Sequence, residues 1–367
     1  MPEQLLLLVT ILIAVGFDFT NGFHDTANAI ATSVSTRAVS PRMAVLISAV
    51  LNLAGAVITV VFFQAKVSNT IGKIVAFKVG LVVIIAALIG AIAWNLITWY
   101  LGLPSSSTHA LVGALSGAAI AAAHGLAGVR GSEFWKTVLS LVISPPAGFV
   151  LAALVMSALL LIFHRARPAP LNRTFRRLQI LTAALVSYSH GANDAQKTMA
   201  VITLALVASG HLQKFQVPVW VVLLSASAIA FGTYAGGWRI IRTLGWRIYK
   251  LDPATGVSAQ LTGAAVIQFA TQFGLPVSTT HVVTGSVMGA GASRRLSALR
   301  WGVGVRGRYF ALAIRPSLSS STQVEPISRL ARARDTRPSA ISRSSTSWTT
   351  SACVQRTILR PLNASIK

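Results

Sequence analysis

The sequence predicts an all-α polytopic membrane protein, built as an inverted repeat with two re-entrant helical hairpins. Three observations predict this fold class: long apolar runs, two motifs that each occur twice, and basic residues placed between the runs. Of the 367 residues, 53% are hydrophobic and 11% are charged, and the mean hydropathy is +0.66. Apolar runs near membrane-spanning length recur through residues 1–300, which excludes an ordinary soluble globular protein.

The first doubled motif interrupts an apolar run in each half of the chain. Residues 102–109 read Gly-Leu-Pro-Ser-Ser-Ser-Thr-His, and residues 274–281 read Gly-Leu-Pro-Val-Ser-Thr-Thr-His. Gly and Pro break a helix, so the hydroxyl residues lie at the N-terminus of the next helix. Free backbone N–H groups and the positive end of the helix dipole favour an anion there. Two such broken helices predict an anion site where they meet.

The apolar runs also give the expected order of elements. In the first half, spans are expected over residues 4–35, 43–64, 79–101 and 137–163, with the first hairpin helix running to about Ala123. Pro145 and Pro146 are expected to interrupt the last of these spans. In the second half, spans are expected over residues 178–208 and 217–236, and residues 257–293 hold the second hairpin.

The second doubled motif is a polar cluster inside the first span of each half. The first cluster contains Asp18, Thr20, Asn21, Gly22, His24, Asp25 and Asn28, and the second contains His190, Gly191, Asn193, Asp194, Gln196 and Lys197. Gly22 aligns with Gly191 and Asp25 with Asp194, both at an offset of 169, while the two serine motifs align at an offset of 172. Two motifs in one order at nearly one spacing indicate an internal duplication. If each serine motif is a re-entrant hairpin, each half makes an odd number of crossings. The two halves would then lie in opposite orientations in the membrane.

Positive charge follows the loops. The formal net charge is +24, but Lys and Arg lie mainly between the apolar runs, so nucleic acid is not expected as a partner. With the N-terminus outside, the predicted inside loops hold 14 Lys and Arg and the outside loops hold 6. This bias has the sign that the positive-inside rule requires. We therefore expect a multi-pass protein of the cell membrane, in contact with the lipid bilayer.

These features divide the chain into four parts. Residues 1–163 are the first transmembrane repeat, residues 164–177 a basic cytoplasmic linker, and residues 178–305 the second transmembrane repeat. Residues 306–367 form a basic tail, rich in Arg, Ser and Thr, without a run able to span a bilayer. The duplication predicts a partner for the last span of the first repeat there. The tail is therefore interpreted as a shifted reading frame or as a disordered basic segment.

The carboxylates of the two polar clusters are the strongest functional candidates. A carboxylate within a membrane helix is unfavourable and indicates a functional site, although a helix-capping role is the structural alternative. Asp25 and Asp194 would repel an anion unless they carry protons or a cation, which gives a physical basis for symport. The histidines of the motifs are split among four segments, so no metal site and no cofactor are expected. Without a catalytic signature, an enzyme is not expected either.

Four motifs together resemble the inorganic phosphate transporter (PiT) family, over roughly residues 5–303. They are Gly22-Phe-His-Asp-Thr-Ala-Asn28, Gly191-Ala-Asn-Asp-Ala-Gln-Lys197 and the two Gly-Leu-Pro turns. The resemblance implies a carrier, working as a homodimer, that imports inorganic phosphate together with a coupling cation. Carried over by motif, the implied phosphate-binding residues are Asp25, Asn28, Ser106, Ser107, Thr108, Asn193, Asp194, Ser278, Thr279 and Thr280.

Two departures from the sodium-coupled relatives bear on the coupling ion. His24 stands where those relatives have Asn, and Gln196-Lys197 replaces Ala-Asn in the second cluster. A lysine ammonium would compete with Na⁺ for the same oxygens. The sequence thus resembles the bacterial proton-coupled branch, for which a neutral metal–phosphate complex is a further form of the cargo. We expect proton coupling through Asp25, Asp194, Lys197 and His24. The alternatives are a sodium-coupled symporter, a permease for another tetrahedral oxyanion such as sulfate, and a non-transporting membrane protein.

Overall fold

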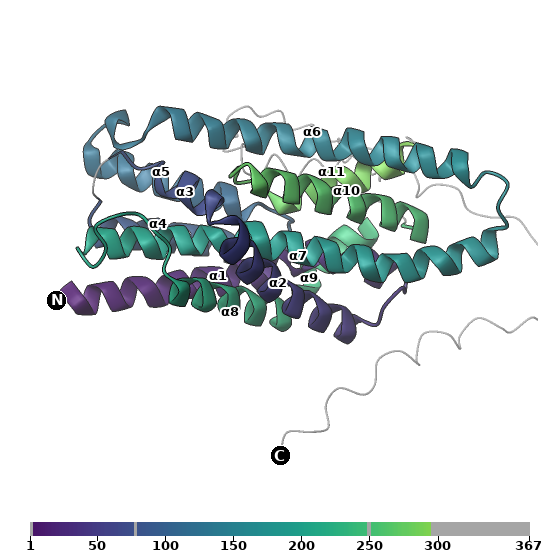
Figure 1. Ribbon diagram of the computed structural model, residues 1–367, viewed down its shortest axis with the longest axis horizontal. Helices are drawn as coiled ribbons and strands as arrows, with labels where there is room; N and C mark the ends of the chain where they lie inside the picture. The colour runs from purple at the N-terminus through teal and green to yellow at the C-terminus, as the bar shows by residue number, and fades with distance from the viewer. Residues whose placement is uncertain (1–2, 77–78, 248–250, 295–367) are drawn as a thin grey trace, which may run out of the picture. The chain divides into compact units, whose positions relative to one another are not determined.

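The computed structural model describes residues 3–76, 79–247 and 251–294, and this part of the chain is almost entirely helical (Figure 1). Within it no strand is present beyond an isolated β-bridge between Val75 and Val129. The all-α prediction is confirmed, and the predicted tail 306–367 lies outside the described residues. The helices are α1 (Glu3–Ser35), α2 (Pro41–Phe63), α3 (Lys66–Gly72), α4 (Leu81–Tyr100), α5 (Ser107–Ala123), α6 (Gly131–Ile162), α7 (Pro168–Ala208), α8 (Val219–Ala235), α9 (Trp238–Arg242), α10 (Pro253–Gln272) and α11 (Thr279–Ala292).

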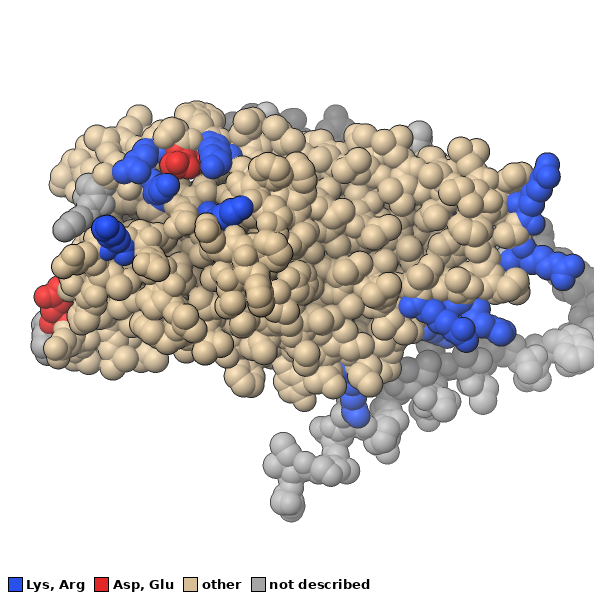
Figure 2. Space-filling view, viewed as in Figure 1, with Lys and Arg blue, Asp and Glu red and all other residues tan. Residues whose placement is uncertain are grey.

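Several helices are suited to a bilayer. Helices α1, α2, α4 and α6 are long and apolar enough to cross a membrane, and α8 with the α9 segment, bent by 60° at a break, can form a fifth span. Large apolar side chains such as Phe62 and Leu161 are exposed, at 73% and 75%, whereas Asp25, Asp194 and Lys197 are buried. On the face drawn in Figure 2, charged side chains gather toward the two ends and the surface between them is largely uncharged. The prediction of a multi-pass membrane protein is confirmed.

The two serine motifs fold in the same way. The first forms the turn between α4 and α5, the second the turn between α10 and α11, and the helices of each pair pack together. Gly102 and Gly274 have φ of 66° and 67°, a left-handed conformation that glycine adopts without strain. Ser106 and Ser278 then cap the helices that follow, because their side chains accept hydrogen bonds from backbone N–H groups three residues later. Both predicted helical hairpins are therefore present, and their re-entry into the membrane stays a prediction.

One local prediction is wrong. Helix α6 continues through Pro145 and Pro146 instead of breaking, because α11 packs closely along it and a tightly packed membrane helix tolerates proline. Most of the segment 164–177 is helical, since α7 begins at Pro168, and its role as a cytoplasmic linker stays a prediction. Proline suits the first turn of a helix, where its missing N–H is not needed.

The order of elements repeats along the chain. A long helix with a polar cluster, a second helix, a short helix and a helical hairpin occur as α1 to α5 and again as α7 to α11. The two sets also pack in exchanged pairs, α1 against α8 and α7 against α2. A Cβ at Gly22 would overlap the backbone oxygen of Ile229, and a Cβ at Gly191 that of Asn52. These equivalent contacts agree with an internal duplication, and the opposite orientation of the halves stays a prediction.

Candidate substrate and ion site

Side chains from four helices meet at one buried place, where the N-termini of α5 and α11 approach the middle of α1 and α7. The two hairpins touch there directly, because Thr108 Oγ1 donates a 2.8 Å hydrogen bond to the carbonyl oxygen of Val277. None of the polar side chains at this place is more than 2% exposed. They are Asp25 and Asn28 of α1, Ser107 and Thr108 of α5, Asn193, Asp194 and Lys197 of α7, and Thr279 and Thr280 of α11.

Asp25 connects both hairpins to α1. Its Oδ2 atom accepts a 3.1 Å hydrogen bond from Ser107 Oγ of the first hairpin, and its Oδ1 atom accepts one of 3.0 Å from Thr280 Oγ1 of the second. The neighbouring His24 places Nδ1 2.7 Å from Asp25 Oδ1, while its Nε2 lies 3.1 Å from Thr98 Oγ1. A single carboxylate therefore holds the two helix N-termini together.

Lys197 links Asp194 of α7 to the first hairpin. Its ammonium is 2.8 Å from Asp194 Oδ2 and donates hydrogen bonds of 2.9 Å to Ser107 Oγ and 3.0 Å to Thr108 Oγ1. Asp194 and Lys197 are three residues apart on α7, a spacing that places both on one face of the helix. Two oxygens of the first hairpin and one carboxylate oxygen thus surround a positive charge that belongs to the protein.

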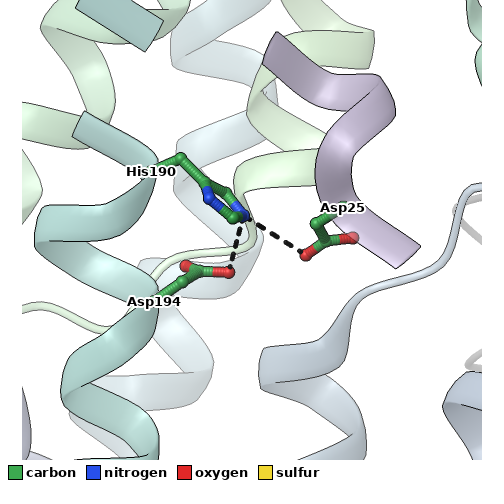
Figure 3. A group of neighbouring side chains, drawn as sticks. All are labelled: Asp25, His190 and Asp194. Carbon is green, nitrogen blue, oxygen red and sulfur yellow. Dashed lines mark ion pairs between the residues drawn. The ribbon is translucent and has the colours of Figure 1, made fainter. Parts of the chain in front are cut away.

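His190 lies between the two carboxylates (Figure 3). Its Nε2 is 3.3 Å from Asp194 Oδ2 and 3.8 Å from Asp25 Oδ2, and its Nδ1 is 3.0 Å from Asn52 Oδ1. The Asn52 amide is oriented by Thr233, whose hydroxyl donates to the Ile229 carbonyl and accepts from Asn52 Nδ2. Asn52 Oδ1 consequently faces His190, and Nδ1 of that imidazole carries a hydrogen.

This tautomer leaves Nε2 of His190 facing two carboxylates. An unprotonated nitrogen there would meet only lone pairs, so the arrangement requires either an imidazolium or a cation between the three groups. Ligand atoms from Asp25, His190 and Asp194 all lie within 4.8 Å of one another, close enough to hold a metal ion. Sequence reasoning left His190 out of the site, although its place four residues before Asp194 on one helix face was a usable signal.

The remaining predicted residues have more local roles. The hydroxyls of Ser106 and Ser278 are occupied as helix caps rather than directed at Asp25 or Asp194. Asn28 Nδ2 donates to Thr280 Oγ1 at 2.9 Å, and Asn193 Nδ2 donates to Thr271 Oγ1 at the same distance. Both amides therefore bind the second hairpin, and the carbonyl oxygens of Asn28 and Asn193 have no hydrogen-bond partner within the part of the chain that is described.

A sequence model of the phosphate transporter family matches residues 21–311, which include both serine motifs, the second polar cluster and the first cluster from Asn21 onward. The chain belongs to this family. Phosphate is the substrate of the phosphate transporter family. The polar clusters and serine motifs that resemble this family form the buried site.

Similar proteins agree with membership of the phosphate transporter family. A protein of Bacillus subtilis (strain 168), described as a probable low-affinity inorganic phosphate transporter, is 51% identical over 307 residues, 83% of this chain and 92% of that protein. A protein of Rhizobium meliloti (strain 1021) with the same description is 47% identical over 302 residues, 81% of this chain and 89% of its own. The solved structure of "The sodium-dependent phosphate transporter" matches with a TM-score of 0.75 and 28% identity, over 84% of this chain and 94% of that one.

Proposed function

We propose that this member of the phosphate transporter family imports inorganic phosphate across the cell membrane by proton symport. The observation that carries the proposal is the buried ammonium of Lys197, in contact with Asp194, Ser107 and Thr108. A buried cation at the N-terminus of α5, with the Thr279 hydroxyl of α11 close to its partner Asp194, is suited to an oxyanion. Phosphate entering between the hairpins would find Lys197, Ser107, Thr108, Thr279 and Thr280 as donors.

The charge balance of the site gives a reason for coupling. Without phosphate, Lys197 neutralises Asp194 at 2.8 Å. An arriving phosphate draws the ammonium to itself, and the buried carboxylate is left without its counter-ion. Such a state is strongly unfavourable unless another positive charge arrives with the anion. A proton bound by a carboxyl group near Lys197 supplies this charge, and its release on the inner side restores the ion pair and expels the phosphate.

The same contacts disfavour sodium as the coupling ion. A sodium ion needs carboxylate and hydroxyl oxygens, and the ammonium of Lys197 already occupies those of Asp194, Ser107 and Thr108. The solved relative named for sodium dependence supports the fold of this chain, and its coupling ion is a property of that protein.

A second form of the cargo is favoured by one specific observation. Asp25, His190 and Asp194 converge within 4.8 Å, with an imidazole nitrogen facing both carboxylates. A divalent cation that enters with phosphate, as a neutral metal–phosphate complex, would find nitrogen and oxygen ligands there. If phosphate enters as such a complex, His190→Ala should reduce phosphate uptake measured with Mg²⁺ or Zn²⁺ more than phosphate uptake measured with a chelator.

The deciding experiment is transport by the purified full chain in proteoliposomes. We expect labelled phosphate to accumulate in sodium-free buffer when an inward proton gradient is imposed, and an uncoupler to abolish this uptake. Protein-free liposomes are the control for leakage. Competition by excess arsenate but not by sulfate would assign the site to phosphate rather than to tetrahedral oxyanions in general. A strict sodium requirement would overturn proton symport.

A further inference from the structure

The first polar cluster contains a carboxylate that the site described above does not use. Asp18 lies on α1 seven residues before Asp25, so the two share a helix face and are separated by about two turns. Asp18 is 0% exposed, and neither of its carboxylate oxygens has a hydrogen-bond partner among the described residues. An ionised carboxylate without a partner is very unfavourable inside a membrane protein. The environment of Asp18 therefore suits a neutral, protonated carboxyl group.

The surroundings of Asp18 connect it to the candidate site. Lys197 and Asp194 of α7 are close enough to influence Asp18 electrostatically, although neither forms an ion pair or hydrogen bond with it among the described residues, and the side chains of Thr198 and Asn21 lie beside it. The hydroxyl of Thr198 and the amide of Asn21 also lack hydrogen-bond partners within the described ranges. The other helices that pack extensively on α1, α4 and α8, contain no Asp, Glu, Lys, Arg or His. Ionisation of Asp18 would therefore act on the Lys197 ammonium through space, without a direct ion pair among the described residues.

Asp18 differs from the other two carboxylates in what it contacts. Asp25 accepts hydrogen bonds from Ser107 and Thr280 and lies against His24, and Asp194 is paired with Lys197. Both can stay ionised because donors and cations surround them. Asp18 has no such partner in the described part of the chain, so of the three it is the carboxyl group best suited to carry a proton.

We propose that Asp18 carries the coupling proton. This inference rests on the proposed proton symport. It assigns the coupling proton to Asp18 instead of to Asp25 or Asp194, which the sequence predicts. With its carboxyl group protonated, Asp18 leaves the Lys197 ammonium free to bind phosphate. When the O–H bond breaks and the proton leaves toward the inside, the Asp18 carboxylate attracts Lys197. Phosphate then loses its counter-ion and is released, and Lys197 keeps its own proton throughout.

The test separates proton coupling from phosphate binding in proteoliposomes that contain the full chain. Asp18→Asn keeps the size of the side chain and cannot release a proton. We expect it to exchange external for internal phosphate at equal pH within about twofold of the wild type. Accumulation driven by an inward proton gradient should fall at least about tenfold, and phosphate-driven proton entry, followed with an internal pH dye, should be lost. Glu3→Gln, which removes an exposed carboxylate from the same helix, should change neither.

The outcomes distinguish this inference from the proposed function. If the wild type accumulates phosphate on a proton gradient and Asp18→Asn does so equally well, Asp18 does not carry the proton. If the wild type shows no such accumulation, proton symport itself is wrong. Should Asp18→Asn fail to fold, Asp18→Glu provides a second measurement. It keeps a titratable group in an altered position and should shift the pH at which uptake is half-maximal, and an unchanged midpoint contradicts the inference.

Discussion

Two described side chains can place a positive charge beside Asp194, those of Lys197 and His190. Replacing Lys197 by methionine removes the closer one. The side chain keeps its length and apolar stem, but three contacts of 2.8, 2.9 and 3.0 Å disappear, to Asp194, Ser107 and Thr108. Both members of the ion pair are 0% exposed, so water cannot replace the lost partner. Removing one partner of a buried ion pair costs about 3–5 kcal/mol.

Two single variants and their combination measure this interaction. We expect Lys197→Met and Asp194→Asn each to destabilise the chain by about 3–5 kcal/mol. At roughly 2–4 °C for each kcal/mol, the fall in Tm should be about 6 °C or more. The double variant leaves no uncompensated charge, so its cost should be well below the sum, with a coupling energy of at least about 2 kcal/mol. All four proteins are compared by thermal unfolding in one detergent.

The matched control is Lys66→Met, the same substitution at an exposed lysine whose ammonium donates to the Gln272 carbonyl. Its effect on stability should stay within about 0.5 kcal/mol. Phosphate uptake should be lost in Lys197→Met and in the double variant, because neither retains a cation for the anion. Additive effects of the two single substitutions on Tm would refute the buried ion pair, and retained uptake in Lys197→Met would refute its role as the phosphate counter-ion.

Two further predictions concern packing and the contact between the hairpins. Gly191→Ala would press a Cβ into the backbone of Asn52, so little folded protein should survive detergent extraction, whereas Gly113→Ala, which meets no atom within 4 Å, should extract normally. Thr108→Val leaves the Val277 carbonyl without its 2.8 Å donor and should lower stability by about 1–3 kcal/mol, measured by thermal unfolding; an unchanged Tm would contradict the contact.

Local chemistry explains which parts of the fold could be predicted from the sequence. The turns at Gly102 and Gly274 follow from glycine conformation, proline and a serine cap within a few residues, so the pattern carries the whole geometry. The duplication marks Asp25 and Asp194 as equivalent positions, and the structure brings both beside His190, while their part in binding stays a prediction. The continuity of α6 could not be predicted from the sequence, because prolines break an isolated helix. Only packing against α11 makes the unbroken helix favourable.

Other parts of the site depend on contacts between distant segments. Asn52 lies in an apolar span with nothing local to distinguish it, yet it sets the tautomer of His190. The two meet because Gly191 lets α7 approach the backbone of α2, a close contact that hydrophobic periodicity does not encode. Asp18 was visible as a member of the first cluster. Only the structure distinguishes Asp18 from Asp25, because Asp25 accepts hydrogen bonds and Asp18 has no hydrogen-bond partner among the described residues.

The contacts of Asp25 also constrain how the carrier can open. One carboxylate accepts from Ser107 on the first hairpin and from Thr280 on the second, so moving the hairpins apart removes at least one of these donors. The loss leaves a buried carboxylate with fewer partners, which is unfavourable unless other groups replace the donor. In the proposed proton symport, phosphate and its accompanying proton would occupy these hydroxyls and replace the link. Opening that separates the hairpins without such a replacement is thereby disfavoured.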